Sequence, residues 1–318
     1  MILVGLLGLA EATSHLSAVR NALKAPSVGS PSRRFELQLD GLDRFVESDR
    51  HVDCIILGNS TALLGVDPEV LAESYHARTG RSLRCFNFGV GGMTASAAGA
   101  VAPILVERYQ PRLLLYVVSP RDVGQSVDGP RLAQTPWVQY RLGAFSGEGW
   151  LAEHSAAFRY YLLYRQWLDP SLWPAAASAG GTDRAGFLRA KIRLPLSPVL
   201  WEHTVRTYAE VARQPPSAAE LAGFERVLAL SAEGTRVVIV EAPVHERLRD
   251  WAKQSTSFYG DAMTALRRAA RRQHVAFWRA PTRRIIPADG WSDFVHLGAS
   301  GAAGFSEWLG ARLAESRG

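Results

Sequence analysis

Short apolar runs alternate with longer amphipathic stretches along most of this chain. Continuous apolar runs rich in β-branched residues, such as Leu113 to Val118, are typical of strands that are buried on both faces. Five runs predict strands, at 53–57, 83–88, 113–118, 236–241 and 275–278. Helical spacing occurs between them, at 67–78, 94–108, 217–232, 256–272 and 299–315. This alternation predicts an α/β fold with a doubly wound, five-stranded parallel sheet, helices on both faces and right-handed crossovers.

The expected start and end of one helix are especially well marked. Asp67 is suited to an N-cap, Pro68 to the first turn, and Gly80 to the end of the helix. A helical lead-in is expected over 11–52, with a Pro/Ser/Gly break at 26–32 and amphipathic spacing at 35–46.

The first ten residues are wholly apolar, and Glu11 ends the run. Ten residues are too few to span a bilayer, and no basic segment precedes them as in a signal peptide. Residues 1–25 are therefore interpreted either as the remaining half of a membrane anchor or as an apolar helix docked on the domain. We favour the anchor, because an apolar helix at the terminus has no patterned partner.

The alternation of strands and helices is interrupted between 123 and 216, where aromatic residues are frequent. The tryptophans of this stretch are Trp137, Trp150, Trp167, Trp173 and Trp201, and a low-complexity segment covers 175–182. We interpret 123–216 as a partly helical insertion in a single domain that extends over 35–318, and an insertion of this size is usually functional or a separate lobe.

Composition narrows the class of protein. The 318 residues are 47% hydrophobic and 21% charged, as in a globular protein. Two cysteines, Cys54 and Cys85, exclude a disulfide scaffold and are expected to be buried free thiols. The net charge of +6 comes almost entirely from arginine, and its densest cluster, at 267–272, fits the polar face of one helix. Without a recognition motif, we expect no nucleic-acid partner.

Candidate polar residues follow each predicted strand. They are Ser60 after the first strand, Gly89 to Gly92 after the second, Arg121 and Asp122 after the third, His245 after the fourth, and Asp293 and His296 after the fifth. Because the carboxyl ends of parallel strands meet at one edge of a sheet, we expect these residues to converge there.

Acyl transfer needs a nucleophile, a base, an orienting carboxylate and donors for an oxyanion. Ser60, His296 and Asp293 meet the first three needs, and backbone N–H groups around Ser60 and Gly92 meet the last. Taken singly, each side chain has an equally good structural explanation as a turn, capping or surface residue. His245 is an alternative base or a substrate contact, and a capping role explains it equally well.

Taken together, the motifs resemble the SGNH (GDSL-like) hydrolase family over about 54–312, with the insertion unmatched. Gly58-Asn59-Ser60 resembles the block that carries the nucleophile, although the family normally has Asp at the position of Asn59. Residues 87–92 (NFGVGG) resemble the second block, which implies an oxyanion donor at Gly92. Residues 293–297 (DFVHL) match the block that carries the acid and the base.

The third block departs from the family pattern. Arg121 stands where the family has an asparagine whose amide completes the oxyanion hole, and the resemblance implies Arg121 as the third donor, because an arginine can also donate hydrogen bonds. This departure is more similar to the envelope-associated DltD-like and alginate-acetylation branch than to simple secreted lipases. That likeness implies a location in the cell envelope, either anchored in the membrane or periplasmic or extracellular, with the cytoplasm as the alternative.

Other site classes fit less well. The Gly-rich turn at 89–92 lacks the last glycine of a dinucleotide-binding loop, and no acidic residue ends the next strand. His245-Glu246 and Glu202-His203 lack the paired ligand spacing of a metal site. We expect no metal and no cofactor.

The sequence therefore predicts a flavodoxin-like SGNH-type domain that acts as a serine esterase, through an acyl-serine at Ser60. An O-acyltransferase with the same residues, working beside a membrane partner, is the second hypothesis. An O-acylated envelope carbohydrate is the expected substrate class, and Asn59 and His245 are candidate substrate contacts. A non-catalytic glycan-binding or scaffold protein of the same fold is the third hypothesis, which Asn59 and Arg121 favour.

Overall fold

The computed structural model describes residues 2–16, 18–19, 23, 25–124, 128–168, 181–190, 196–212 and 215–316. These residues group into two compact units, Met1–Asp40 with Pro130–Ala179, and Gly41–Gly129 with Gly180–Gly318. The predicted insertion at 123–216 is thus divided between the two units. Trp173, the side chain of Trp167 and most of the low-complexity segment lie outside the described residues. The division into a segment at 1–25 and one domain at 35–318 stays a prediction.

The second unit is built on one parallel sheet. Its strands are β1 (Cys54–Gly58), β2 (Cys85–Gly89), β3 (Leu113–Val118), β4 (Arg236–Glu241) and β5 (Ala276–Arg279). They lie in the order β2-β1-β3-β4-β5, and every neighbouring pair is parallel. All residues of β1, β2 and β3 are buried, as their apolar composition predicts. The predicted α/β fold with a five-stranded parallel sheet is confirmed.

The strand order places a topological switch point between β1 and β3. The chain leaves β1 for β2 on one side of it and then returns to β3 on the other side. Open parallel sheets bind ligands in the crevice at the carboxyl ends of strands at such a point. The segments that follow β1 and β3 therefore lie where a site is expected.

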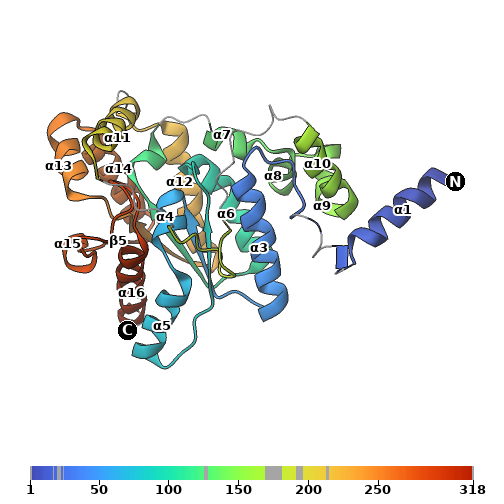
Figure 1. The fold of residues 1–318 in the computed structure, drawn as a ribbon, viewed down its shortest axis with the longest axis horizontal. Coiled ribbons are helices and arrows are strands. Elements are labelled where there is room, and N and C mark those ends of the chain that lie inside the picture. The colour runs from blue at the N-terminus through green and yellow to red at the C-terminus, as the bar shows by residue number, and fades with distance from the viewer. Residues whose placement is uncertain are drawn as a thin grey trace. The chain divides into compact units, whose positions relative to one another are not determined.

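Helices of the second unit cover both faces of the sheet. They are α4 (Ser60–Gly65), α5 (Pro68–Thr79), α6 (Ala95–Tyr109), α11 (Pro198–Val211), α12 (Ala218–Ala229), α13 (Glu246–Ser255), α14 (Phe258–Arg272), α15 (Thr282–Ile285) and α16 (Ala299–Glu315), with short 3₁₀ turns η1 (Pro120–Val123) and η3 (Leu230–Glu233). Helix α16 lies beside α5 (Figure 1), and both pack on the face that carries Leu115 and Val117. Helix α12 packs against α6 and the opposite face, where the rings of Phe224 and Tyr116 have centroids 5.9 Å apart.

The predicted boundaries of α5 are confirmed. The Asp67 carboxylate accepts hydrogen bonds from the backbone N–H groups of Glu69 at 3.0 Å and Val70 at 3.4 Å. Gly80 ends the helix in the left-handed conformation, at φ 67°. Cys54 and Cys85 face each other in the register of β1 and β2 and are buried free thiols, as expected.

The first unit contains α1 (Ile2–Ser14), α8 (Pro136–Arg141), α9 (Gly147–His154) and α10 (Ala156–Leu168). Helices α3 (Arg33–Asp49) and α7 (Asp128–Ala133) each cross a boundary between the units along the chain. Within the first unit, α1 is tied to the start of α10. The Glu11 carboxylate accepts hydrogen bonds from Ser155 Oγ at 2.7 Å and from the N–H of Ala156 at 2.9 Å.

Glu11 is ionised over an unusually wide pH range. Partial burial raises its pKa, but hydrogen bonds from Ser155, Ala156, Ala157 and His15 outweigh burial and lower the pKa to about 2. Among the described residues, no helix is long and apolar enough to cross a membrane. The membrane anchor proposed for residues 1–25 stays a prediction.

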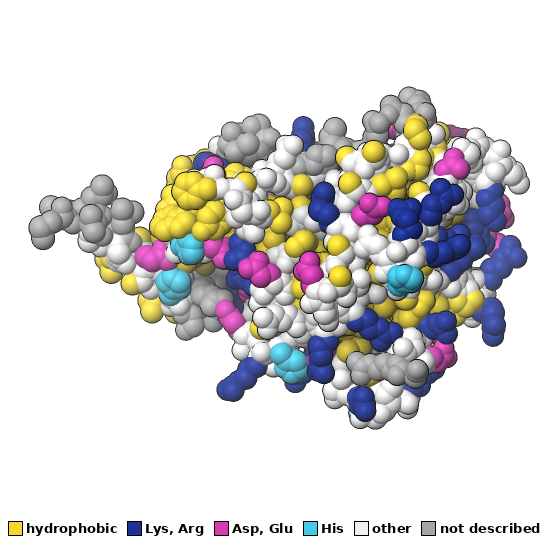
Figure 2. Space-filling view, turned by 180° about the vertical axis from the view of Figure 1, so that it is seen from behind, with side chains coloured by type: hydrophobic (Ala, Val, Ile, Leu, Met, Phe, Trp, Pro, Cys, Tyr) yellow, Lys and Arg dark blue, Asp and Glu magenta, His cyan; other side chains and the backbone are white. Residues whose placement is uncertain are grey.

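Two kinds of surface are visible in Figure 2. Lys and Arg side chains gather on the part of the second unit that holds α13, α14 and α15. In the first unit, large apolar side chains are exposed on α9 and α10 and in the loop before α9; they include Phe145, Trp150, Tyr161, Tyr164 and Leu168.

Candidate active site

Ser60 lies at the carboxyl end of β1, as the sequence predicts, but not in a simple turn. It is the first residue of the short helix α4, and Asn59 is the N-cap of that helix. Gly58 permits the close approach of this corner to β3, because its φ is 152° and an added Cβ would lie 2.6 Å from the carbonyl oxygen of Val117. Residues 58–60 thus form a strand-to-helix junction.

Ser60, His296 and Asp293 form a continuous chain of hydrogen bonds. Ser60 Oγ lies 2.8 Å from His296 Nε2, and His296 Nδ1 lies 2.7 Å from Asp293 Oδ2. Ser60 comes from the end of β1, and Asp293 and His296 come from the loop between α15 and α16. Ser60 and His296 are 236 residues apart in sequence. A hydroxyl, an imidazole and a carboxylate in this order are the arrangement that activates a serine nucleophile.

The loop that carries Asp293 and His296 is fixed by its own hydrogen bonds. Asp293 Oδ1 accepts from the N–H groups of Val295 and His296, both at 2.7 Å, which leaves Oδ2 for the imidazole. A bridge between Trp291 and Leu297 closes the loop. Burial raises the pKa of Asp293, but the hydrogen bonds from His296 and from the two backbone N–H groups outweigh burial, so the pKa lies below its ordinary value. Asp293 is therefore an ionised partner for the imidazole.

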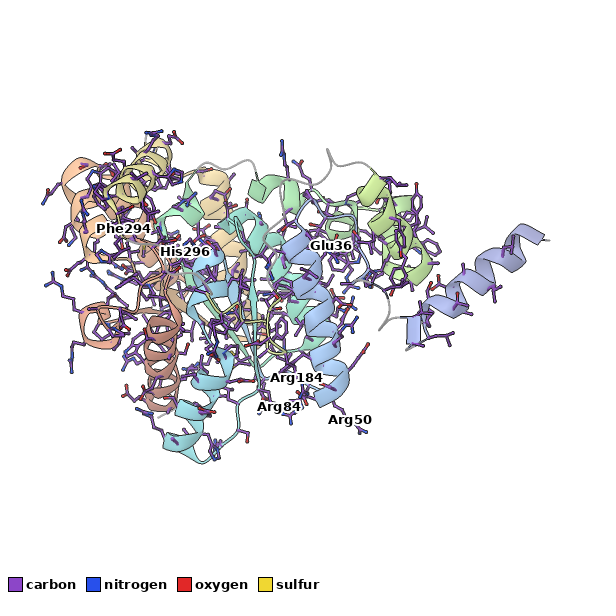
Figure 3. The ribbon with its side chains drawn as sticks, in the orientation of Figure 1. Glu36, Arg50, Arg84, Arg184, Phe294 and His296 are labelled. Carbon is purple, nitrogen blue, oxygen red and sulfur yellow. The ribbon has the colours of Figure 1, made fainter. Side chains whose placement is uncertain are left out.

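Phe294, inside the same loop, is held by side chains of α11 and α13 (Figure 3 labels Phe294 and His296). Its ring centroid lies 5.0 Å from that of Trp201 on α11. The Arg247 guanidinium covers Trp201 at 4.2 Å, and the ring of His245 lies 5.3 Å from that of Phe294. Because Phe294 is buried, these contacts restrain the loop between Asp293 and His296.

His245 supports this loop and is not among the described side chains that line the cavity at Ser60. It is the N-cap of α13, where its Nδ1 accepts a hydrogen bond from the N–H of Arg247 at 3.2 Å, and its ring also packs on Trp291. Partial burial lowers its pKa. This placement favours the capping interpretation over a substrate contact.

Two backbone N–H groups at the cavity, those of Ser60 and Gly92, have no hydrogen-bond acceptor among the described residues. At the start of α4, the neighbouring N–H of Thr61 is bonded to Asn59 Oδ1, and those of Ala62 and Leu63 to the carbonyl of Asn59. Gly92 has φ 78°, a conformation that favours glycine, in the turn that follows β2. Both residues line the cavity, so their N–H groups are available to an oxyanion.

Both the oxygen and the nitrogen of the Asn59 side-chain amide form hydrogen bonds within the protein. Its Oδ1 accepts from Thr61 N and Oγ1, at 2.7 and 2.8 Å. Its Nδ2 donates to Asp122 Oδ1 at 2.6 Å and to Ser119 Oγ at 3.2 Å. Asp122 Oδ2 accepts in turn from the N–H of Ser119. The segments after β1 and β3 are thereby joined across the switch point, and Asn59 acts as a positioning residue more than a substrate contact.

Asp122 is almost fully buried, with 2% of its surface exposed. Burial raises its pKa from 3.8 to about 7, although hydrogen bonds from Ser119 and Asn59 and the charge of Arg121 act in the opposite direction. The sequence identified Asp122 only as a polar residue after the third strand and did not indicate this link to Asn59.

Arg121, the predicted third oxyanion donor, is exposed and lines the cavity. Its Cζ lies 5.8 Å from the ring centroid of Tyr208 on α11. No described residue accepts a hydrogen bond from its guanidinium in this structure. Its contribution to an oxyanion hole stays a prediction.

The cavity at Ser60 has a volume of about 160 Å³. It brings together most of the predicted residues, Asn59, Ser60, Gly92, Arg121, Asp122 and His296, and adds others that the sequence did not identify, Thr61, Met93, Thr94, Ser119, Val211 and Val295. Val211 and the neighbouring Tyr208 come from α11, inside the stretch interpreted as an insertion, where the aromatic content was the only signal.

No family model matches this chain, and no curated protein matches it. Among solved structures, a carbohydrate acetylesterase family member from Sinorhizobium meliloti is 12% identical over 83% of this chain and 98% of that chain, with a TM-score of 0.40. A lipase/acylhydrolase from Enterococcus faecalis is 10% identical over 83% and 95%, with a TM-score of 0.38. The inhibitor-bound aryl esterase of M. smegmatis is 13% identical over 84% and 98%, with a TM-score of 0.35. Likenesses at this level say nothing of the chemistry, so any functional conclusion must come from the side chains of this chain.

Proposed function

We propose that this protein is a serine esterase of the SGNH type that acts through an acyl-serine intermediate. The observation that carries the proposal is the chain from Ser60 Oγ to His296 Nε2 at 2.8 Å and from His296 Nδ1 to Asp293 Oδ2 at 2.7 Å. The backbone N–H groups of Ser60 and Gly92, both at the cavity, supply the hydrogen-bond donors that a tetrahedral oxyanion needs. The motifs at 58–60, 87–92 and 293–297 agree with the same assignment.

The proposed reaction has two steps. Ser60 Oγ attacks the ester carbonyl while His296 takes its proton, and the oxyanion accepts hydrogen bonds from the N–H groups of Ser60 and Gly92. Collapse of the intermediate breaks the bond to the alcohol, which receives the proton from His296. In the second step, water gives its proton to His296 and attacks the acyl-serine, which releases the acid and restores Ser60. Asp293 holds the imidazole in the required tautomer throughout.

The size of the cavity favours a short acyl group. Pockets that enclose drug-sized ligands measure roughly 300–1,000 Å³, whereas this cavity measures about 160 Å³. We expect kcat/KM for 4-nitrophenyl acetate to exceed that for the octanoate by about tenfold or more, because forcing extra methylene groups into a tightly packed cavity costs roughly 1–3 kcal/mol. Val211→Ala, which widens the cavity wall, should reduce this preference. Equal values for the two esters in the wild-type protein would contradict the short-acyl assignment.

The acyl acceptor is a separate part of the proposal. If water accepts the acyl group from Ser60, the protein is an esterase. If a sugar hydroxyl accepts it, the protein is an O-acyltransferase that uses the same residues. The family resemblance favours an O-acylated carbohydrate of the cell envelope as substrate, and a membrane partner belongs to the transferase form. Release of acetate from 4-nitrophenyl acetate, measured with and without an oligosaccharide acceptor, separates the two: formation of acetylated sugar at the expense of free acetate identifies the transferase.

A fluorophosphonate probe tests the nucleophile directly, because it phosphonylates only an activated serine. We expect stoichiometric labelling of wild-type protein at Ser60, identified by peptide mass spectrometry, and no labelling of Ser60→Ala. Ser257→Ala is the matched control, since Ser257 lies outside the cavity. Labelling of Ser60→Ala at the wild-type rate, or an unlabelled wild-type protein that is folded by circular dichroism, would favour the non-catalytic scaffold instead.

A further inference from the structure

Arg121 brings a positive charge to the cavity, and no described carboxylate forms an ion pair with it. It lies on η1, directly after β3, and is exposed. Apart from His296, it is the only basic residue among the described side chains that line the cavity. None of the described residues forms an ion pair with its guanidinium. An arginine that lines a cavity without a carboxylate partner is available to a ligand.

The two carboxylates of this region are both used by other groups. Asp122, the sequence neighbour of Arg121, points inward and accepts hydrogen bonds from Asn59 Nδ2 and from the N–H of Ser119. Asp293 accepts from His296 Nδ1 and from two backbone N–H groups. Apart from His296, the remaining residues that line the cavity are uncharged: serine, threonine, asparagine, glycine, methionine and valine. The accessible wall of the cavity therefore carries a positive charge and no accessible negative one.

The side chain of Arg121 packs against the ring of Tyr208. Its guanidinium carbon lies 5.8 Å from the ring centroid of Tyr208, whose side chain is buried in α11. The turn itself is fixed, because Asp122 accepts a hydrogen bond from the N–H of Ser119 and so closes a capping box. A guanidinium supported by an aromatic ring keeps its planar set of N–H donors free, and this set matches the two oxygens of a carboxylate or phosphate.

Starting from the proposed esterase function, on which this inference rests, we infer that Arg121 anchors a negatively charged group of the substrate. The preferred substrates are esters that carry a carboxylate or phosphate on the acyl or the alcohol part. Arg121 is then a substrate-binding residue that selects among esters, and the reaction at Ser60 is the same for all of them.

Matched pairs of esters test the anchor. For the acyl part, the pair is 4-nitrophenyl hemisuccinate and 4-nitrophenyl butyrate, and for the alcohol part it is 4-acetoxybenzoate and 4-acetoxybenzamide. Acetoxyphenyl phosphate, compared with the same benzamide, distinguishes a phosphate from a carboxylate. The quantity measured is the ratio of kcat/KM for the anionic ester to kcat/KM for its neutral partner, at low and at high salt.

We expect this ratio to fall by about tenfold or more in Arg121→Gln for at least one pair, the range of one charge-assisted hydrogen bond. Arg121→Lys should retain part of the ratio because it keeps the charge, and high salt should lower the wild-type ratio toward that of Arg121→Gln. Arg271→Gln is the matched control, because Arg271 is exposed on α14 and does not line the cavity. An equal loss on both members of every pair, or an unchanged ratio in every pair, would overturn the inference.

Equilibrium binding separates this inference from the proposed reaction. In Ser60→Ala, which does not turn over ester, the binding of 4-acetoxybenzoate and of 4-acetoxybenzamide can be compared by ligand-observed NMR. The anchor predicts that the additional change Arg121→Gln weakens binding of the benzoate by about tenfold and of the benzamide by a smaller factor. Equal affinities for the benzoate in the single and the double variant would overturn the anchor even if Ser60 is the nucleophile. Conversely, a wild-type protein that resists the fluorophosphonate but shows this charge preference would keep the anchor and refute the esterase.

Discussion

At the scale of a single residue, the ionisation of Asp122 makes the stability of the fold depend on pH. Burial raises its pKa from 3.8 to about 7. Because the pKa is higher in the folded protein than in the unfolded chain, the neutral acid stabilises the fold. This stabilisation is complete below about pH 4 and is lost as the pH rises through about 7. A shift of about three pKa units corresponds to roughly 4 kcal/mol.

We therefore expect the difference in unfolding free energy between wild-type protein and Asp122→Asn to fall by up to about 4 kcal/mol between pH 4 and pH 8. Urea unfolding at fixed ionic strength measures it. Asp289→Asn, at an exposed acidic position, should show no comparable trend. A difference that stays constant over this pH range would mean that Asp122 does not titrate there.

The contact between Asn59 and Asp122 gives a physical reason for an asparagine, and not an aspartate, at position 59. Asn59 Nδ2 lies 2.6 Å from Asp122 Oδ1 and donates to it. An aspartate at position 59 would place a second carboxyl group against this oxygen. Two carboxyl groups at such a distance share a proton at low pH and repel each other when both are ionised.

Asn59→Asp should therefore reduce the unfolding free energy by about 2–4 kcal/mol at pH 8 and by clearly less at pH 5. Asn59→Ala provides the comparison, since it removes the same donor without adding a charge and should show a loss that varies little with pH. If Asn59→Asp is as stable as the wild-type protein at pH 8, the carboxyl groups at these two positions do not repel each other.

At the scale of elements, Glu36, on helix α3, connects this helix to the segment 27–30 of the first unit. Its carboxylate accepts hydrogen bonds from Ser27 Oγ at 2.7 Å and from the N–H groups of Val28 and Ser30, both at 2.8 Å. The side chain is 1% exposed, and burial raises its pKa. Truncation would leave two buried N–H groups without an acceptor, at a cost of about 1–3 kcal/mol each.

Glu36→Ala should lower the unfolding free energy by about 2–4 kcal/mol, measured by urea unfolding, and reduce the hydrogen-exchange protection of residues 27–30. Glu73→Ala, at an exposed position of α5, should stay within about 0.5 kcal/mol of the wild-type protein. Unchanged protection of 27–30 in Glu36→Ala would contradict the assigned role.

The elements that the sequence predicted best are those with the strongest local signal. The strands at 113–118 and 236–241 match β3 and β4 at both ends, because a parallel strand buried on both faces is a continuous apolar run. Helix α4 was missed because six residues, Ser60–Gly65, are too few to show a helical period. Its start depends instead on the side chain of Asn59, which forms the cap.

Side-chain contacts between distant segments were less predictable. Ser60, Asp293 and His296 were identified because each follows a strand and each is a residue type that acyl transfer needs. The hydrogen bond between Asn59 and Asp122 joins positions 63 residues apart, and no local pattern indicates it. The same holds for Tyr208, which reaches Arg121 from a helix inside the predicted insertion.

At the scale of the whole molecule, the sheet assembles the site from loops that are far apart in sequence. The end of β1 supplies Ser60, the end of β2 supplies Gly92, the end of β3 supplies Arg121, and the loop after β5 supplies Asp293 and His296. Parallel strands make this possible because their carboxyl ends all lie at one edge. The residues at this edge should therefore act as one unit in catalysis.

A double-variant comparison tests whether they do. Without its base, Ser60 is a weak nucleophile, and without the serine, His296 has no proton to take, so each loss should abolish the same step. We expect Ser60→Ala and His296→Ala each to lower kcat/KM for 4-nitrophenyl acetate by on the order of 10⁴-fold or more, and the double variant to lose little beyond either one. His203→Ala, at an exposed histidine of α11, should retain wild-type kcat/KM. Losses that multiply in the double variant would show that Ser60 and His296 act in separate steps, despite the 2.8 Å between their side chains.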